Sequence, residues 1–154
     1  MEQDEPHLHF RGFSLWIRGY DCSACDPSKN FWGANRLVVE AELQTASSHV
    51  VLKTSACLNT NELKGFLLRL ESERGIATSS QDWQVVLSSA EDEIDWCINS
   101  RGGSLFFEIK LDVSFAPVFE KHIVMWEMTA AELDIVISQL KSIVSTFPVR
   151  GEQP

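Results

Sequence analysis

Two segments of the chain alternate between apolar and mostly polar positions, which is the pattern of a β-strand with one buried face. In segment 35–45 the apolar positions are Leu37, Val39, Ala41 and Leu43. In segment 104–115 they are Leu105, Phe107, Ile109, Leu111, Val113 and Phe115, and the opposite face carries Phe106, Glu108, Lys110 and Asp112. Both segments are therefore predicted strands whose second face meets solvent or a partner.

Shorter β-forming runs predict the remaining strands. These are 8–18, with a bend expected at Gly12, then 49–57, 82–88, 94–100 and 121–128. Short turns such as "TASS" at 45–48 and "RGG" at 101–103 join neighbouring strands, so we expect antiparallel pairing. Segment 19–34 contains Gly, Asp, Asn and Pro and is predicted to be a loop.

Two helices are predicted from apolar residues at helical spacing. Segment 59–75 is expected to begin with Asn59 as its cap and Glu62 in the reciprocal position, and to end at Gly75. Segment 129–147 begins with a Thr129–Glu132 capping box and is stopped by Pro148. The apolar stripes are Leu63, Phe66, Leu67 and Leu70 in the first helix, and Leu133, Val136, Ile137, Leu140, Ile143, Val144 and Phe147 in the second.

The predicted order is β-β-β-α-β-β-β-β-α, which indicates an α+β fold. We expect an antiparallel sheet of about six or seven strands with two amphipathic helices packed on it. The 154 residues fit a single domain, 1–154, with an ordered core at about 8–150. Residues 1–6 and 151–154 are expected to be frayed.

The net charge of −9 argues against nucleic acid as a partner. A field of this sign repels phosphate backbones, so we expect no binding to nucleic acid. It favours a basic protein partner, although solubility alone also explains it. The acidic start "MEQDEPHLHF" does not resemble a secretory signal, and no apolar run is long enough to span a membrane. The expected location is the cytoplasm, with all four cysteines reduced.

Cys22 and Cys25 form a CxxC pair, the usual mark of a metal or redox site. A structural zinc site needs two more ligands, yet Cys57 and Cys97 are single and lie in predicted strands. The two strand cysteines are expected to be small buried residues. The pair is followed by Asp-Pro and a loop where a thioredoxin-like motif would open a helix. We therefore expect no metal and no cofactor, and keep a metal- or thiol-dependent protein as an alternative.

Charged rows on the strands suggest a binding surface. Glu40 and Glu42 lie on the outward face of one strand, and Glu108 and Asp112 on that of another. Such rows are either a solvated face or a docking site for Lys and Arg of a basic partner. The candidate partner-binding residues are Glu40, Glu42, Glu108, Asp112, Phe31, Trp32 and Phe106, in which the three rings would serve as anchors. The alternative for Phe31 and Trp32 is a loop folded over the edge of the core.

The stretch "FWGANRLVVEAEL…SACLNTNELKGFLLRL" carries a family resemblance. It resembles the WapI-type immunity proteins of bacterial toxin systems, over about residues 8–150. The matching positions are Asn35 and Leu37; Cys57, Leu58, Thr60, Glu62 and Leu63; the strand at 104–115; and Phe147, Pro148 and Arg150. Gly33 and Arg36 depart from the family pattern, which has Asp and Trp there, and "QDWQVVL" occupies the place of an expected Glu-Pro-Asn-Leu stretch.

The resemblance implies a protein that is not an enzyme and that binds and neutralises a cognate toxin in the cytoplasm of the producing cell. Many toxins of such systems are basic nucleases, which agrees with the acidic charge. The pattern residues look structural, so the resemblance supplies no active site. An adaptor that uses the same acidic face for another partner remains an alternative.

Overall fold

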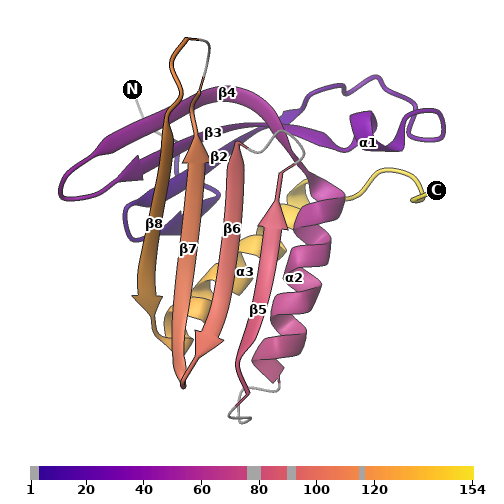
Figure 1. Ribbon diagram of the computed structural model, residues 1–154. Helices are drawn as coiled ribbons and strands as arrows, with labels where there is room; N and C mark the ends of the chain where they lie inside the picture. The colour runs from indigo at the N-terminus through magenta and orange to yellow at the C-terminus, as the bar shows by residue number, and fades with distance from the viewer. Residues whose placement is uncertain (1–3, 76–80, 90–92, 115–116) are drawn as a thin grey trace.

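The structure is a computed structural model that describes residues 4–75, 81–89, 93–114 and 117–154. Its architecture is α+β, as predicted, and Figure 1 shows the elements. In chain order they are β1 (Leu8–Phe10), β2 (Phe13–Tyr20), α1 (Phe31–Ala34), β3 (Arg36–Gln44), β4 (His49–Asn59), α2 (Thr60–Gly75), β5 (Trp83–Ser88), β6 (Ile94–Arg101), β7 (Ser104–Asp112), β8 (Lys121–Met128) and α3 (Ala130–Thr146). Relative to the prediction, the first strand is divided in two and the loop contains the short helix α1.

The strands form two antiparallel sheets in the described part of the chain, where one sheet of six or seven strands was expected. Sheet A has the order β1-β2-β3-β4 and sheet B the order β5-β6-β7-β8. Helix α2 follows β4 and carries the chain away from the edge of sheet A, so β5 begins a new sheet (Figure 1). Because an alternating pattern reports only that one face of a strand is buried, it does not say which strands pair.

The predicted bend at Gly12 is a tight turn between β1 and β2. Arg11 has a positive φ of 54°, and Phe10 pairs with Phe13 across the turn. Gly12 is needed here because a Cβ at this position would lie 1.8 Å from the carbonyl oxygen of Gln44. The Gly12 carbonyl accepts a hydrogen bond from the Gln44 N–H at 2.8 Å, which ties the turn to the end of β3.

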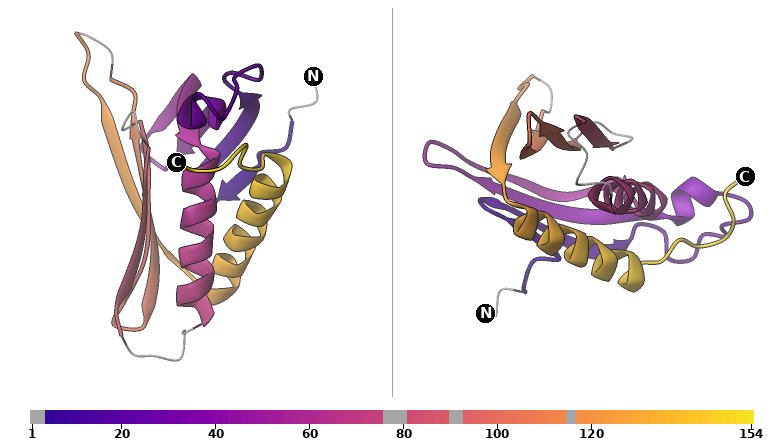
Figure 2. Two further views of the ribbon diagram at one scale, coloured as in Figure 1. Left: turned by 90° about the vertical axis from the view of Figure 1, so that its right-hand side faces the viewer. Right: turned by 90° about the horizontal axis from the view of Figure 1, so that it is seen from below.

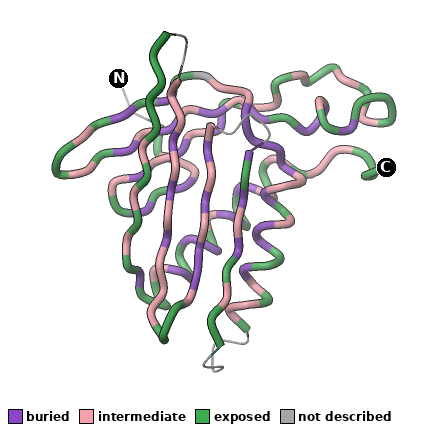
Figure 3. The backbone as a smooth tube through the Cα atoms, viewed as in Figure 1, coloured by how far each residue is buried: buried purple, intermediate pink, exposed green. Residues whose placement is uncertain are grey.

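The two sheets and the two long helices share one core. Figure 2 shows α2 and α3 on one side of sheet B, with the strands of sheet A crossing above them. Trp96 of β6 is 1% exposed, and its ring contacts those of Phe13 in β2, Phe66 in α2 and Phe107 in β7. Figure 3 shows the alternation of buried and partly exposed residues along β6 and β7 that the sequence pattern predicts. The end predicted for the longest strand, Phe115, lies outside the described residues.

The helix starts agree only in part with prediction. The capping box of α3 is confirmed, because the Thr129 side chain accepts from the Glu132 N–H while Glu132 accepts from the Thr129 N–H. At α2 the Asn59 side chain accepts from the Asn61 N–H at 2.9 Å. Within the described residues, however, Glu62 forms no hydrogen bond with Asn59, and its Oε2 has no hydrogen-bond partner. The second half of that predicted box is therefore wrong.

Within the described part of the chain, no helix is long and apolar enough to cross a membrane.

Candidate functional site

The outer face of sheet B, turned away from the helices, brings together three of the predicted partner-binding residues. Phe106, Glu108 and Asp112 of β7 belong to this face, because they alternate with the buried residues Phe107, Ile109 and Leu111. The cross-strand pairs that β7 and β8 place on it are Phe106–Glu127, Glu108–Met125, Lys110–Ile123 and Asp112–Lys121. From β6 come Asp95, opposite Lys110, and Cys97, opposite Glu108. We call these ten residues the sheet B face.

Its charges are only partly compensated. Lys110 Nζ lies 2.6 Å from Asp95 Oδ2, and Lys121 Nζ lies 3.6 Å from Asp112 Oδ2. Glu108 forms no ion pair with any described residue, and the same holds for Glu127 across the described part of the chain. As far as the described residues show, these two carboxylates are thus available to meet positive charge from outside.

Exposed apolar side chains lie directly beside these carboxylates. Ile123 is 62% exposed and Met125 is 54% exposed, and Phe106 is partly exposed on the neighbouring strand. Next to Glu108 the face is hollowed to a volume of about 300 Å³, lined in part by Cys97. Apolar surface rimmed by polar groups is typical of protein–protein contact sites.

Two local effects set the ionisation of this face. Hydrogen bonds from the side chain and the N–H of Ser114 hold the pKa of Asp112 below its ordinary value, and Lys121 adds to the shift. Burial raises the pKa of the Cys97 thiol, the Asn99 amide opposes the rise, and the Glu108 carboxylate reinforces it. Asp112 is therefore held in its charged form and Cys97 as a neutral thiol.

Glu40 and Glu42 lie on sheet A, so the structure separates them from Glu108 and Asp112. Glu40 accepts from Arg18 Nη2 at 2.8 Å, and Glu42 lies 2.8 Å from the Nε2 of His49. Both carboxylates therefore already have a partner within the molecule, which makes them less available to a partner than Glu108.

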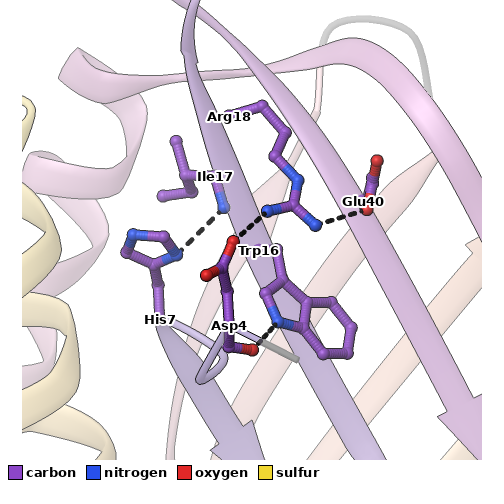
Figure 4. A network of polar contacts seen from close by, with 6 residues as sticks. All are labelled: Asp4, His7, Trp16, Ile17, Arg18 and Glu40. Carbon is purple, nitrogen blue, oxygen red and sulfur yellow. Dashed lines mark hydrogen bonds and ion pairs between the residues drawn. The ribbon is translucent and has the colours of Figure 1, made fainter. Parts of the chain in front are cut away.

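A polar network surrounds Glu40 and includes residues that sequence reasoning missed. Figure 4 shows Arg18 between the carboxylates of Asp4 and Glu40, at 3.3 and 2.8 Å. The Trp16 indole N–H donates to the Asp4 carbonyl at 2.7 Å. Asp4, which lies in the segment expected to be frayed, thus contacts both Trp16 and Arg18. No motif in the sequence links these residues, because only the strand pairing brings them together.

His7 lies next to this network and is partly buried (Figure 4). Its Nδ1 accepts a hydrogen bond from the Ile17 N–H at 3.1 Å (Figure 4). Burial lowers the pKa of His7, Arg18 lowers it further, and Asp4 acts in the opposite direction. The ring is thus held neutral with its proton on Nε2, as the acceptor role of Nδ1 requires.

The two aromatic candidates of the loop have different environments in α1. Phe31 is 5% exposed and packs at the edge of the core, which agrees with the alternative interpretation of this loop. Trp32 is 47% exposed and stands edge-on to the Phe31 ring. It lines a hollow of about 250 Å³ together with Arg36 and Glu62. Burial raises the pKa of Glu62 there.

Five of the residues that carry the family resemblance, Asn35, Thr60, Phe147, Pro148 and Arg150, take part in one group of hydrogen bonds, which we call the node. Asn35 is fully buried, donates to the Arg150 carbonyl at 2.9 Å and accepts from the Arg150 N–H at 2.7 Å. The Thr60 N–H donates to the Asn35 carbonyl, and the Thr60 hydroxyl donates to the Phe147 carbonyl. Pro148 accepts from the Tyr20 hydroxyl. These residues fix the C-terminal segment onto the start of β3 and α2.

Arg150 also holds the loop that contains the CxxC pair. Its guanidinium donates to the carbonyl oxygens of Cys22, Ser23, Cys25 and Ala34, at 3.0–3.1 Å. A planar fork with five donors suits this arrangement better than a single ammonium group would.

Cys22 and Cys25 are joined by a disulfide, which corrects the expectation that all four cysteines are reduced. The bond leaves neither thiolate free to act as a zinc ligand or nucleophile in this structure. Cys57 is buried as expected, whereas Cys97 is only partly buried and lies on the sheet B face. Among the described residues, no group of three or more His, Cys, Asp or Glu side chains is placed to hold a metal ion.

A family model described as the immunity protein WapI-like family matches residues 7–148, nearly the whole chain. No curated protein and no solved structure matches the chain. The match covers the two sheets, α2, α3 and most of the node that joins Asn35, Thr60 and Phe147. The chain therefore belongs to the WapI-like immunity protein family.

Proposed function

We propose that this protein protects the cell that makes it by binding a cognate toxin directly, without catalysing a reaction, and that the sheet B face is the contact surface. Membership of an immunity protein family supports the protective role. We choose this surface because the Glu108 carboxylate forms no ion pair with a described residue and lies between the exposed Met125 and the ring of Phe106.

The proposed partner is a basic toxin domain, of which a nuclease is the leading candidate. The protein has a net charge of −9, which draws a positively charged partner toward it over long distances. At short range, Glu108 and Asp112 would meet Lys or Arg side chains, while Phe106 would pack against their aliphatic parts. We place the encounter in the cytoplasm, where a nuclease would find its substrate.

The other predicted contact residues take a lesser part in this proposal. Trp32 offers an exposed ring, but it lies in α1 and away from the sheet B face. Glu40 and Glu42 keep their internal partners Arg18 and His49, so their removal would disturb sheet A more than it would disturb binding.

Co-expression tests the protective role. The toxin domain encoded immediately upstream should arrest growth when it is produced alone, and this protein should restore growth and form a one-to-one complex with it. Failure to restore growth would overturn the proposed function. A complex with a different basic protein in the absence of protection would indicate an adaptor.

Charge reversal tests the surface. We expect Glu108→Lys to weaken toxin binding by at least about tenfold, because it places a positive charge where the proposal puts a cation of the partner. Glu42→Lys, on sheet A, is the matched control with the same change in net charge. Equal loss of affinity in the two variants would contradict the sheet B face, and circular dichroism would verify that both are folded.

A further inference from the structure

Strand β8 forms an open edge of sheet B. Its pairing with β7 is continuous from Leu105 opposite Met128 to Asp112 opposite Lys121, with no bulge. Its other side has no neighbouring strand in the described sheet, and β8 borders the front sheet in Figure 1. A regular strand with one unpaired side presents a row of N–H and C=O groups to another chain.

The other sheet edges are protected. In β1, which has three residues, the His9 N–H donates to Gln139 of α3 at 3.0 Å. In β5 the Val86 carbonyl accepts from Arg69 of α2 at 2.9 Å. The pairing of β4 with β3 shifts register twice, which disturbs the edge of sheet A. For β8, by contrast, no hydrogen bond from a described side chain reaches the backbone of 121–128.

The outward side chains of β8 are complementary to those of a second β8 strand that runs antiparallel to it. They are Lys121, Ile123, Met125 and Glu127, all of them exposed. A cation and an anion stand at the ends, and two large apolar side chains stand between them. Natural edge strands usually carry charges or bulges at such central positions.

We propose that β8 pairs antiparallel with β8 of a second copy, with Val124 at the two-fold axis. In this register Lys121 lies opposite Glu127 of the partner subunit, and Ile123 lies opposite Met125 of the partner subunit. Each such pair occurs twice by symmetry, as an isologous interface requires. Opposite charges and large apolar side chains are favourable cross-strand neighbours.

The neighbouring registers are worse. With Ile123 at the axis, Lys121 would face Met125 of the partner subunit. With Met125 at the axis, Ile123 would face Glu127 of the partner subunit. Of these three registers, only the one with Val124 at the axis places opposite charges across from each other and apolar side chains across from each other. We therefore infer this register.

The dimer goes beyond the proposed function and does not depend on it. It joins the two B sheets into one continuous sheet, with both outer faces on the same side. Phe106 and Glu108 lie on β7, one strand away from the new junction, and remain open for a partner.

Light scattering coupled to size exclusion, together with sedimentation equilibrium of the full chain, measures the proposed association. We expect a dimer whose dissociation constant rises at least about tenfold in Lys121→Glu and in Glu127→Lys. The double variant Lys121→Glu/Glu127→Lys should recover much of the association, because it restores opposite charges across the axis. A monomer from low micromolar to near-millimolar concentration would overturn the proposal.

Cross-linking tests the register without relying on stability. In a Cys97→Ser background, oxidation of a mixture of Ile123→Cys and Met125→Cys proteins should give a disulfide-linked heterodimer. Each variant oxidised alone should cross-link much less. Equal cross-linking in all three samples would contradict the Val124 register. A monomeric protein would overturn the dimer, and loss of toxin protection in its β8 variants would then support the sheet B face as the toxin contact.

Discussion

His7 makes the stability of the protein depend on pH through one ring nitrogen. Its Nδ1 accepts from the Ile17 N–H, and burial lowers its pKa below the ordinary value. In the unfolded chain the ring regains its ordinary pKa, so the unfolded state binds more protons as the pH falls through that value. The stabilising contribution of the neutral ring is therefore present at higher pH and is lost as the pH decreases.

Substitution of His7 by Gln should remove this dependence. Gln keeps an acceptor for the Ile17 N–H but has no proton to gain. Between about pH 7.5 and about pH 5.5, urea unfolding should show a smaller loss of free energy in His7→Gln than in the unchanged protein. An unchanged pH slope would show that His7 is not kept neutral by the fold.

Arg150 is the residue whose removal should affect the node most. Its side chain satisfies four carbonyl oxygens of the loop, and its guanidinium lies 5.0 Å from the centroid of the Tyr20 ring. We expect Arg150→Ala to lower the free energy of unfolding by on the order of 2–3 kcal/mol. Arg150→Lys should restore only part of it, because an ammonium group lacks the planar fork.

Chemical denaturation measures both Arg150 variants. Arg101→Ala is the control, since Arg101 is exposed and its side chain forms no hydrogen bond within the described residues. Similar losses in Arg150→Ala and Arg101→Ala would mean that the loop does not depend on the guanidinium.

At the scale of elements, the spacing of apolar residues predicts which face of a strand is buried and where the two long helices begin. The alternation in 104–115 places Phe107, Ile109 and Leu111 inside, and all three are fully buried. Both long helices begin within one residue of their predicted starts, and α3 has its predicted cap. These features are local, so neighbouring residues encode them.

The candidate site was less accessible to prediction because it depends on pairing between distant strands. Glu40 and Glu108 have the same pattern in sequence but belong to different sheets. The contributions of Ile123 and Met125 follow from the register of β8 with β7, which no local pattern fixes. The cysteines were expected to be reduced because the protein was expected in the cytoplasm. Cys22 and Cys25 form a disulfide because the geometry of their loop brings them together.

The cap of α3 gives a prediction for a single element. Thr129→Ala removes the side-chain oxygen that accepts from the Glu132 N–H at 3.1 Å. Thermal or urea unfolding should show a loss of about 1 kcal/mol. Ser138→Ala, at an exposed position inside the same helix, is the control and should be neutral or slightly stabilising. Equal effects of the two substitutions would contradict the importance of the cap.

The whole molecule combines a large negative charge with a small number of free carboxylates on its proposed contact face. Glu40, Glu42, Asp95 and Asp112 each have an internal cationic partner, although the total remains −9. His49 serves as such a partner only when it is protonated. The long-range field therefore belongs to the entire protein, whereas short-range recognition depends on particular residues such as Glu108. The rates of binding can separate these two contributions.

Salt and charge reversal should act on different rate constants of toxin binding. The screening length shrinks from about 30 Å at 0.01 M salt to about 8 Å at 0.15 M, so the association rate constant should fall steeply over this range. Glu42→Lys and Glu108→Lys change the net charge equally and should slow association to a similar extent. Only Glu108→Lys should also speed dissociation, because only that carboxylate is proposed to touch the toxin.

Surface plasmon resonance measures both the association and the dissociation rate constant. An association rate that does not respond to salt would show that the partner is not basic, and a faster dissociation of Glu42→Lys would move the contact to sheet A.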